Sequence, residues 1–193
     1  MKTEIKYRPS TLNDVIYPNS GVKRQIGSIA NGQLQANVLL WGPNGTGKTT
    51  VAEMLPTAIN GGQPPLNIER NFKQILNDKN IEEYIQRKVQ WAKTAHGEKL
   101  FMVFHEFDNA GKDLYEFWTL LEKYNEDIVF IATTNKLNSI DSAVISRCTE
   151  INFPSVKAEM FLPRAMDILK AEVVLYDAQF VLNALHKWES IGD

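Results

Sequence analysis

Gly42-Pro43-Asn44-Gly45-Thr46-Gly47-Lys48-Thr49 decides the fold of this chain, because Gly-x-x-x-x-Gly-Lys-Thr is the spacing of a phosphate-binding loop. The stretch follows the apolar run Val38–Trp41 and precedes a helical pattern that begins at Thr50, which is the context such a loop requires. A glycine-rich turn with a coincidental lysine is the alternative, and this context argues against it. We predict that residues 42–50 bind the phosphates of a nucleotide, and that Pro56 kinks the following helix or ends it early.

Each residue type in the loop has a chemical reason to be there. The glycines allow consecutive backbone N–H groups to point inward at phosphate oxygens, and Lys48 brings a positive charge to the β- and γ-phosphates. The hydroxyl of Thr49 is a ligand for Mg²⁺, and the helix that follows adds the positive end of its dipole. The predicted cofactors are therefore ATP or ADP with Mg²⁺.

The composition is that of an ordinary globular chain. Of 193 residues, 44% are hydrophobic and 23% are charged, which leaves room for about two domains. The 21 Lys and Arg residues balance 23 Asp and Glu residues to a net charge of -2, so any contact with DNA must be local. The single cysteine, Cys148, excludes an intramolecular disulfide and a cysteine zinc cluster. No apolar run approaches the roughly 18 residues that span a membrane, and residues 1–10 contain no signal core. We predict a cytoplasmic protein without a membrane partner.

Apolar runs alternate with helical patterns along most of the chain, which predicts an α/β fold with a parallel sheet and helices on both faces. The predicted strands are residues 38–41, 65–70, 100–104, 128–133 and 149–153. Helical spacing recurs at 81–92, capped by Asp78 or Asn80 and stopped by Gly97, and at 114–121. After Pro154 the pattern is helical only, at 160–169 and 180–188. We therefore predict a nucleotide-binding domain over residues 1–154 and a small helical unit over residues 155–193.

The second buried strand ends in a polar cluster that includes His105, Glu106 and Asp108. In P-loop ATPases an aspartate at this strand end holds magnesium, and the glutamate directly after it polarises the attacking water. Here Glu106 stands in the base position, but His105 stands in the aspartate position. Imidazole brings no negative charge and Mg²⁺ prefers oxygen ligands, which predicts a lower metal affinity that Asp108 offsets only through a shifted geometry. The alternatives are a solvated carboxylate for Glu106 and a plain polar strand end for His105.

Two further polar residues lie after later strands. Asn135 follows the strand at 128–133, where its amide would lie beside the γ-phosphate and orient water. Arg147, within Ser146-Arg147-Cys148, would stabilise transition-state charge if it faced a nucleotide. An arginine in a polar segment is, by itself, more often a surface residue.

These motifs together resemble the clamp-loader ATPase subunits of the AAA+ family, such as the small subunits of replication factor C and the ATPase subunit of T-even phage clamp loaders. The resemblance is carried by Lys6-Tyr7-Arg8-Pro9-Ser10-Thr11-Leu12, residues 42–49, Glu106-Phe107-Asp108, Glu122-Lys123-Tyr124, Asn135, Ser146-Arg147-Cys148 and Phe153-Pro154-Ser155. The Ser-Arg-Cys motif is the most discriminating of these, because generic AAA+ proteins rarely carry it.

The resemblance implies a P-loop NTPase domain followed by a helical lid, within a ring-like hetero-oligomer. Such a ring binds ATP between subunits, opens a sliding clamp and places it on primer-template DNA. The resemblance also implies that Tyr7, Arg8 and Pro9 lie near the adenine, that Asn135 is sensor 1, and that Arg147 reaches the ATP site of the adjacent subunit. The implied partners are other clamp-loader subunits, the clamp and DNA.

Candidate DNA contacts are Arg87, Lys88 and Lys93, on the helix predicted from residue 81 to 95. An ordinary solvated face is the alternative for these three side chains. The C-terminal Gly192-Asp193 departs from the resemblance, because in the family such a pair leads to the sensor 2 arginine and a collar domain. We therefore expect a lid that is truncated before sensor 2.

His105 leaves open whether the chain hydrolyses ATP. The leading hypothesis is an ATP-hydrolysing motor subunit of a clamp loader. The second hypothesis is a nucleotide-binding scaffold of the same assembly that does not hydrolyse ATP. The third is another AAA+ remodeller, such as a branch-migration or helicase-loading ATPase, and the Ser-Arg-Cys motif argues against it.

Overall fold

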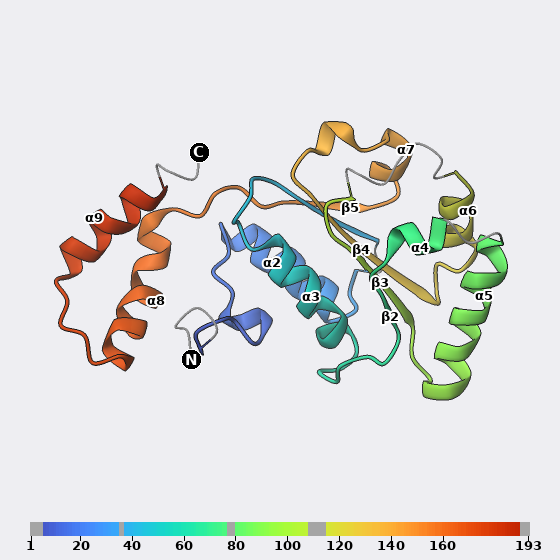
Figure 1. Cartoon of the computed structure of the whole chain (residues 1–193), viewed down its shortest axis with the longest axis horizontal. Coiled ribbons are helices and arrows are strands. Elements are labelled where there is room, and N and C mark those ends of the chain that lie inside the picture. The colour runs from blue at the N-terminus through green and yellow to red at the C-terminus, as the bar shows by residue number, and fades with distance from the viewer. Residues whose placement is uncertain (1–5, 35–36, 77–79, 108–114, 190–193) are drawn as a thin grey trace.

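The protein contains a five-stranded parallel sheet in the order β2-β3-β4-β1-β5 (Figure 1). The computed structural model describes residues 6–34, 37–76, 80–107 and 115–189. The strands are β1 (Val38–Trp41), β2 (Ile68–Glu69), β3 (Leu100–Phe104), β4 (Ile128–Thr134) and β5 (Thr149–Asn152). The α/β fold with a parallel sheet is therefore confirmed. The predicted strand at 65–70 is wrong in extent, because only two of its residues pair with β3.

Two hydrophobic clusters cover the two faces of the sheet, and alternate residues of β1, β3 and β4 divide between them. Leu39, Met102 and Phe130 pack in one cluster, whereas Leu40 and Val103 pack in the other. The first cluster includes side chains of α5 (Ile81–Trp91) and α6 (Tyr115–Lys123), and the second includes side chains of α2 (Ser20–Ala30) and α3 (Lys48–Ile59). The prediction of helices on both faces is confirmed.

The ends of α5 match their predicted signals. The Asn80 side chain accepts a hydrogen bond from the Glu83 N–H at 3.1 Å, and Gly97 adopts φ 65° after the π-helical turn η2 (Ala92–His96). Asp78, the alternative cap, lies outside the described residues. The remaining short elements are η1 (Leu12–Asp14), α4 (Phe72–Leu76), η4 (Leu137–Ser139) and α7 (Ser142–Ile145).

Helix α3 corrects the prediction that Pro56 ends it early. The helix continues for three residues beyond Pro56 to Ile59, and the Asn60 N–H still bonds to the Pro56 carbonyl at 3.0 Å. A proline ring removes one helical N–H, but its carbonyl remains an acceptor for the next turn. Pro56 is also buried, so its ring contributes to packing where a solvent-facing proline would not.

Helices α8 (Ala158–Ala171) and α9 (Ala178–Glu189) follow β5 and pack against each other, with the Phe161 and Trp188 rings 5.8 Å apart. In Figure 1 this pair lies at the end of the molecule away from α5, with the N-terminal segment between it and α2. The division of the chain at residue 154 stays a prediction. Within the described residues, no helix is both long and apolar enough to cross a membrane.

Candidate functional site

The loop from Gly42 to Gly47 joins β1 to α3 at the carboxyl edge of the sheet. Gly47 caps α3 at φ 91°, a left-handed conformation that places the N-terminus of this helix at the loop. A Cβ atom at Gly42 would lie 2.2 Å from the carbonyl oxygen of Phe153, which follows β5. Glycine is therefore required at residue 42 by the close approach of two backbones.

A cavity of about 260 Å³ lies beside this loop. Its lining brings together residues 44–50, Glu106 and residues 133–135. The sequence-predicted loop, base candidate and amide candidate therefore meet around one volume. Thr133 and Thr134 were not predicted as site residues, although both are nearly fully buried polar side chains at the end of β4. Two hydroxyls at the end of an otherwise apolar strand are the signal that would have found them.

Lys48 is buried within the loop, with 5% of its surface exposed. Its ammonium donates hydrogen bonds to the carbonyl oxygens of Gly42 at 2.7 Å and Pro43 at 2.5 Å. Burial lowers the pKa of Lys48, because removal from water disfavours the charged form. The loop thus holds a partly desolvated cation against its own carbonyls, and a bound phosphate would be a stronger acceptor for it.

Glu106 and Asn135 reach the cavity from the ends of neighbouring strands. Glu106 adopts φ 51°, a left-handed conformation that is costly for a residue with a side chain. Its backbone N–H donates to the Thr133 hydroxyl at 3.4 Å. Both Glu106 and Asn135 are exposed, so each side chain remains accessible to water and to a ligand. The geometry permits the base and amide roles expected for them.

His105 is hydrogen-bonded to Glu53, a residue of α3 that the sequence reasoning missed. The His105 Nε2 and Glu53 Oε1 atoms are 2.7 Å apart, and Arg70 Nη2 lies 2.9 Å from the other carboxylate oxygen. Arg70 and then His105 lower the pKa of Glu53 against the opposing effect of burial, so this carboxyl is ionised. Asp108, the residue expected to compensate for His105, lies outside the described residues.

The donors beside Thr49 do not fit a magnesium ion held by protein carboxylates. Thr49 offers one exposed hydroxyl, and the strand-end residue where a carboxylate was expected is His105, an imidazole bonded to Glu53. The carboxylate that contacts that imidazole, Glu53, already bonds Arg70 through its second oxygen. Among the described residues there is no group of three or more His, Cys, Asp or Glu side chains arranged for a metal.

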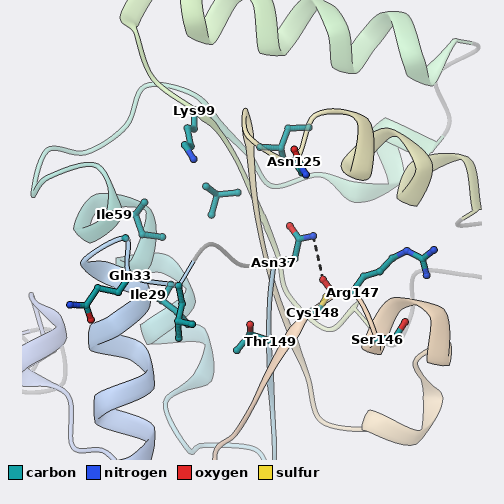
Figure 2. Close-up of a pocket in the computed structure, with 14 residues that line it drawn as sticks. Ile29, Gln33, Asn37, Ile59, Lys99, Asn125, Ser146, Arg147, Cys148 and Thr149 are labelled. Atoms are coloured by element: carbon teal, nitrogen blue, oxygen red, sulfur yellow. Dashed lines mark hydrogen bonds between the residues drawn. The ribbon is translucent and has the colours of Figure 1, made fainter.

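Arg147 lies away from the loop, beside a second cavity of about 690 Å³ at the amino edge of the sheet (Figure 2). Its guanidinium bonds to the carboxylate of Glu122 and, at 2.8 Å, to the carbonyl of Ala143. The adjoining Cys148 is partly buried, and the loss of water around its thiol raises its pKa to about 12. The structure does not bring Arg147 to the chain's own loop, and its role in an adjacent subunit stays a prediction.

The N-terminal segment contacts α8 rather than the loop cavity. The Tyr7 hydroxyl donates to Glu172 at 2.7 Å, and Arg164 Nη2 donates to the Tyr7 carbonyl at 3.3 Å. Tyr7, Arg8 and Pro9 are not among the described residues that line the cavity. Their predicted position near the adenine therefore stays untested.

Two of the three side chains predicted to contact DNA form ion pairs with carboxylates of this chain. Lys88 pairs with Glu69 at 2.5 Å, and Lys93 pairs with Asp127 at 2.7 Å. Arg87 is exposed on α5, with its guanidinium 5.9 Å from the centre of the Tyr84 ring. Phosphates would have to compete with carboxylates at two of the three positions, so Arg87 is the most available of them.

Comparisons with known proteins show the family to which the chain belongs. The model of the ATPase family associated with various cellular activities (AAA) matches residues 38–155, which include the loop, Glu106, Asn135 and Arg147. A replication factor C small subunit 1 of Pyrobaculum arsenaticum is 28% identical over 172 residues, covering 86% of this chain and 51% of that protein. The replication factor C small subunit of Sulfurisphaera tokodaii is 30% identical, covering 89% of this chain and 53% of that protein. Replication factor C subunit 5 of Homo sapiens is 29% identical, covering 88% of this chain and 50% of that protein.

The chain spans about half the length of these relatives. Solved structures resemble it in fold. Thermotoga maritima RuvB superposes with a TM-score of 0.64 at 18% identity, covering 91% of this chain and 58% of that one. Caenorhabditis elegans PCH-2 superposes with a TM-score of 0.62 at 16% identity, covering 84% of this chain and 51% of that one.

Proposed function

This chain belongs to the AAA family of ATPases, and from that premise we propose that it is an ATP-binding subunit of a sliding-clamp loader in DNA replication. The observation that carries nucleotide binding is the convergence of residues 44–50, Glu106 and Asn135 around one cavity. The similarity to replication factor C small subunits over most of this chain supports the clamp-loader assignment. The proposed partners are other loader subunits, a sliding clamp and primer-template DNA.

The loop would bind the phosphates of ATP or ADP. Backbone N–H groups of residues 44–49 and the N-terminus of α3 would donate to phosphate oxygens, and Lys48 would exchange the Gly42 and Pro43 carbonyls for a phosphate. Mg²⁺ enters this proposal as an ion brought by the nucleotide's phosphates, with the Thr49 hydroxyl as its protein ligand, and it would offset phosphate charge.

Hydrolysis would depend on groups from two subunits. Glu106 would accept the proton of the attacking water, and Asn135 would orient that water. Arg147 would stabilise charge at the neighbouring subunit's nucleotide, since it lies at the opposite edge of the sheet from its own loop. A single copy of the chain would therefore hydrolyse ATP poorly.

A scaffold that binds nucleotide without hydrolysing it is the second candidate, because His105 and Glu53 bond to each other where a carboxylate would otherwise face a metal. ATP turnover by the chain assembled with clamp, DNA and partner subunits separates the two candidates. Loss of turnover in Glu106→Gln would support the motor subunit. Turnover that appears only in His105→Asp would support the scaffold.

The clamp-loader assignment has its own test. A tagged chain should recover a sliding clamp when ATP is present, and a Lys48→Ala chain should recover less of it. Failure to recover any clamp from the assembled loader would favour a different AAA remodeller and would leave the nucleotide site itself intact as a proposal.

A further inference from the structure

We propose that a bridge from Arg70 through Glu53 to His105 replaces the usual carboxylate–metal link, so that this loop binds nucleotide with little dependence on magnesium. The inference rests on the proposed nucleotide binding and concerns the form of the ligand. It assigns to the site a nucleoside di- or triphosphate whose phosphates need no divalent cation to be held.

The bridge connects three elements at the carboxyl edge of the sheet. Glu53 lies on α3, one turn beyond Thr49 and on the same face of that helix. His105 directly follows β3, and Arg70 directly follows β2. The Arg70 Nη2 and Nε atoms lie 2.9 and 3.2 Å from Glu53 Oε2, whereas His105 Nε2 lies 2.7 Å from Glu53 Oε1. The strand ends are thereby tied to the loop helix by the protein alone.

The chemistry of the bridge disfavours a hard cation at Glu53 and His105, so the Thr49 hydroxyl remains the protein contact for any magnesium that the nucleotide brings. A carboxylate only accepts hydrogen bonds, so the proton of the 2.7 Å bond resides on His105 Nε2, and that nitrogen has no lone pair for a metal. Each Glu53 oxygen already accepts from a neighbouring side chain, so a cation would have to compete there with His105 and the Arg70 guanidinium. In a metal-dependent site the strand end supplies a carboxylate that holds the metal. Here the strand end supplies the imidazole of His105, and the carboxylate that it contacts, Glu53, lies on α3.

The local charge balance also removes the need for a cation. In a metal-dependent site, the divalent ion offsets both the strand-end carboxylate and the phosphates. Here the Arg70 guanidinium already neutralises Glu53, and the buried ammonium of Lys48 is available to the phosphates. An incoming phosphate therefore does not meet an unpaired carboxylate at Glu53, so repulsion there is small without magnesium.

The test is a calorimetric titration of the full chain with ADP, once in MgCl₂ and once in EDTA. The expected dissociation constants agree within about threefold, which is less than about 1 kcal/mol. Binding that weakens by more than about tenfold in EDTA would overturn the inference and leave the proposed function standing. Absence of binding in both buffers would instead overturn the proposed nucleotide site.

Two substitutions should create the magnesium dependence that the bridge removes. His105→Asp places a second carboxylate opposite Glu53, and Arg70→Gln leaves Glu53 without its cation. Each should weaken ADP binding at least about tenfold in EDTA and much less in MgCl₂. An equal loss in both buffers would indicate a structural role only and would contradict the inference.

His186→Asp is the matched control. His186 faces Glu159 at 3.4 Å in the α8–α9 pair, so this variant makes the same exchange opposite a glutamate on elements that do not line the cavity. It should leave the ratio of the two dissociation constants unchanged. If His105→Asp fails to fold, as judged by circular dichroism, Arg70→Gln still tests the inference, because Arg70 is half exposed.

Discussion

The two edges of the sheet carry cavities of different character. The larger one, at the amino edge, is lined by side chains of scattered segments such as Ile29, Ile59 and Lys99 (Figure 2). The smaller one, at the carboxyl edge, is lined mainly by one continuous backbone loop and the start of α3. Volume therefore does not identify the nucleotide site. Converging backbone donors, a helix N-terminus and a buried ammonium do, because they are arranged for an anion before one arrives.

The largest expected difference between the edges is in nucleotide affinity. Lys48→Ala should weaken ADP binding by about 100-fold, or about 3 kcal/mol, because it removes a charged donor from the phosphates. Lys99→Ala makes the same exchange beside the amino-edge cavity and should leave affinity within about twofold. Calorimetric titration measures both. Equal losses would mean that the two cavities do not differ in the way described.

The next largest difference between the two edges is expected in the loss of stability when a glycine at each edge is replaced by alanine. Gly42→Ala places a Cβ atom 2.2 Å from the Phe153 carbonyl oxygen, so the loop or the end of β5 must shift. We expect the free energy of unfolding to fall by about 3 kcal/mol or more in urea denaturation. Gly32, beside the amino-edge cavity, also has a positive φ, 69° against 144° at Gly42, but an added Cβ atom would meet no atom within 4 Å, so Gly32→Ala should cost about 1 kcal/mol. Similar losses in the two variants would contradict the close approach at Gly42.

The third prediction concerns Cys148 at the amino edge, whose thiol should behave differently in the folded and the unfolded chain. Burial raises the pKa of this thiol to about 12 in the fold. Its thiol should react with iodoacetamide at least about tenfold more slowly in the folded chain than in urea, because only the thiolate is the nucleophile. The unfolded thiol has a pKa near 9.0, so the fold should lose stability as the pH rises from that value toward 12. Equal rates in the two states would show that the amino edge is open to solvent at this residue.

The smallest effect is expected at Arg147. Arg147→Ala should change ADP affinity of the isolated chain by less than about twofold, since its guanidinium bonds Glu122 and Ala143 away from the loop. The unfolding free energy should change by less than about 1 kcal/mol, as for other exposed ion pairs. The assembled loader provides the informative comparison, where the same variant should lose ATP turnover. A large loss of affinity in the isolated chain would place Arg147 in its own site.

The sequence predicted four of the five strands to within one residue, and it predicted the edge strand β2 less well. Leu100 to Phe104 are all buried, so this strand reads as an unbroken apolar run, and its predicted bounds are those of β3. Helix α2 was missed, although Asn19 caps it and Val22, Ile26 and Ile29 have helical spacing. Strand β2 is only two residues long, too short for its pattern to fix its ends.

Some features of the candidate site could likewise be predicted from the sequence, and others could not. Glu106 and Asn135 could be predicted because strand ends in a parallel sheet meet at one edge, which follows from order along the chain. The contact between Glu53 and His105 could not, because 52 residues separate them and no local spacing encodes their meeting. It requires α3 to pack against the sheet at β3, which is a property of the folded molecule.

The contacts between the N-terminal segment and α8 have a consequence for folding. Lys6 and Glu172 are 166 positions apart, so their 2.6 Å bond closes nearly the whole chain into a loop. Closing so long a loop costs conformational entropy, and an exposed ion pair that is screened by salt offsets little of this cost. We therefore expect the contacts between the N-terminal segment and α8 to form last during folding and to open first. Hydrogen exchange should be fast in these segments, while the amides of the sheet and of the loop remain protected from exchange.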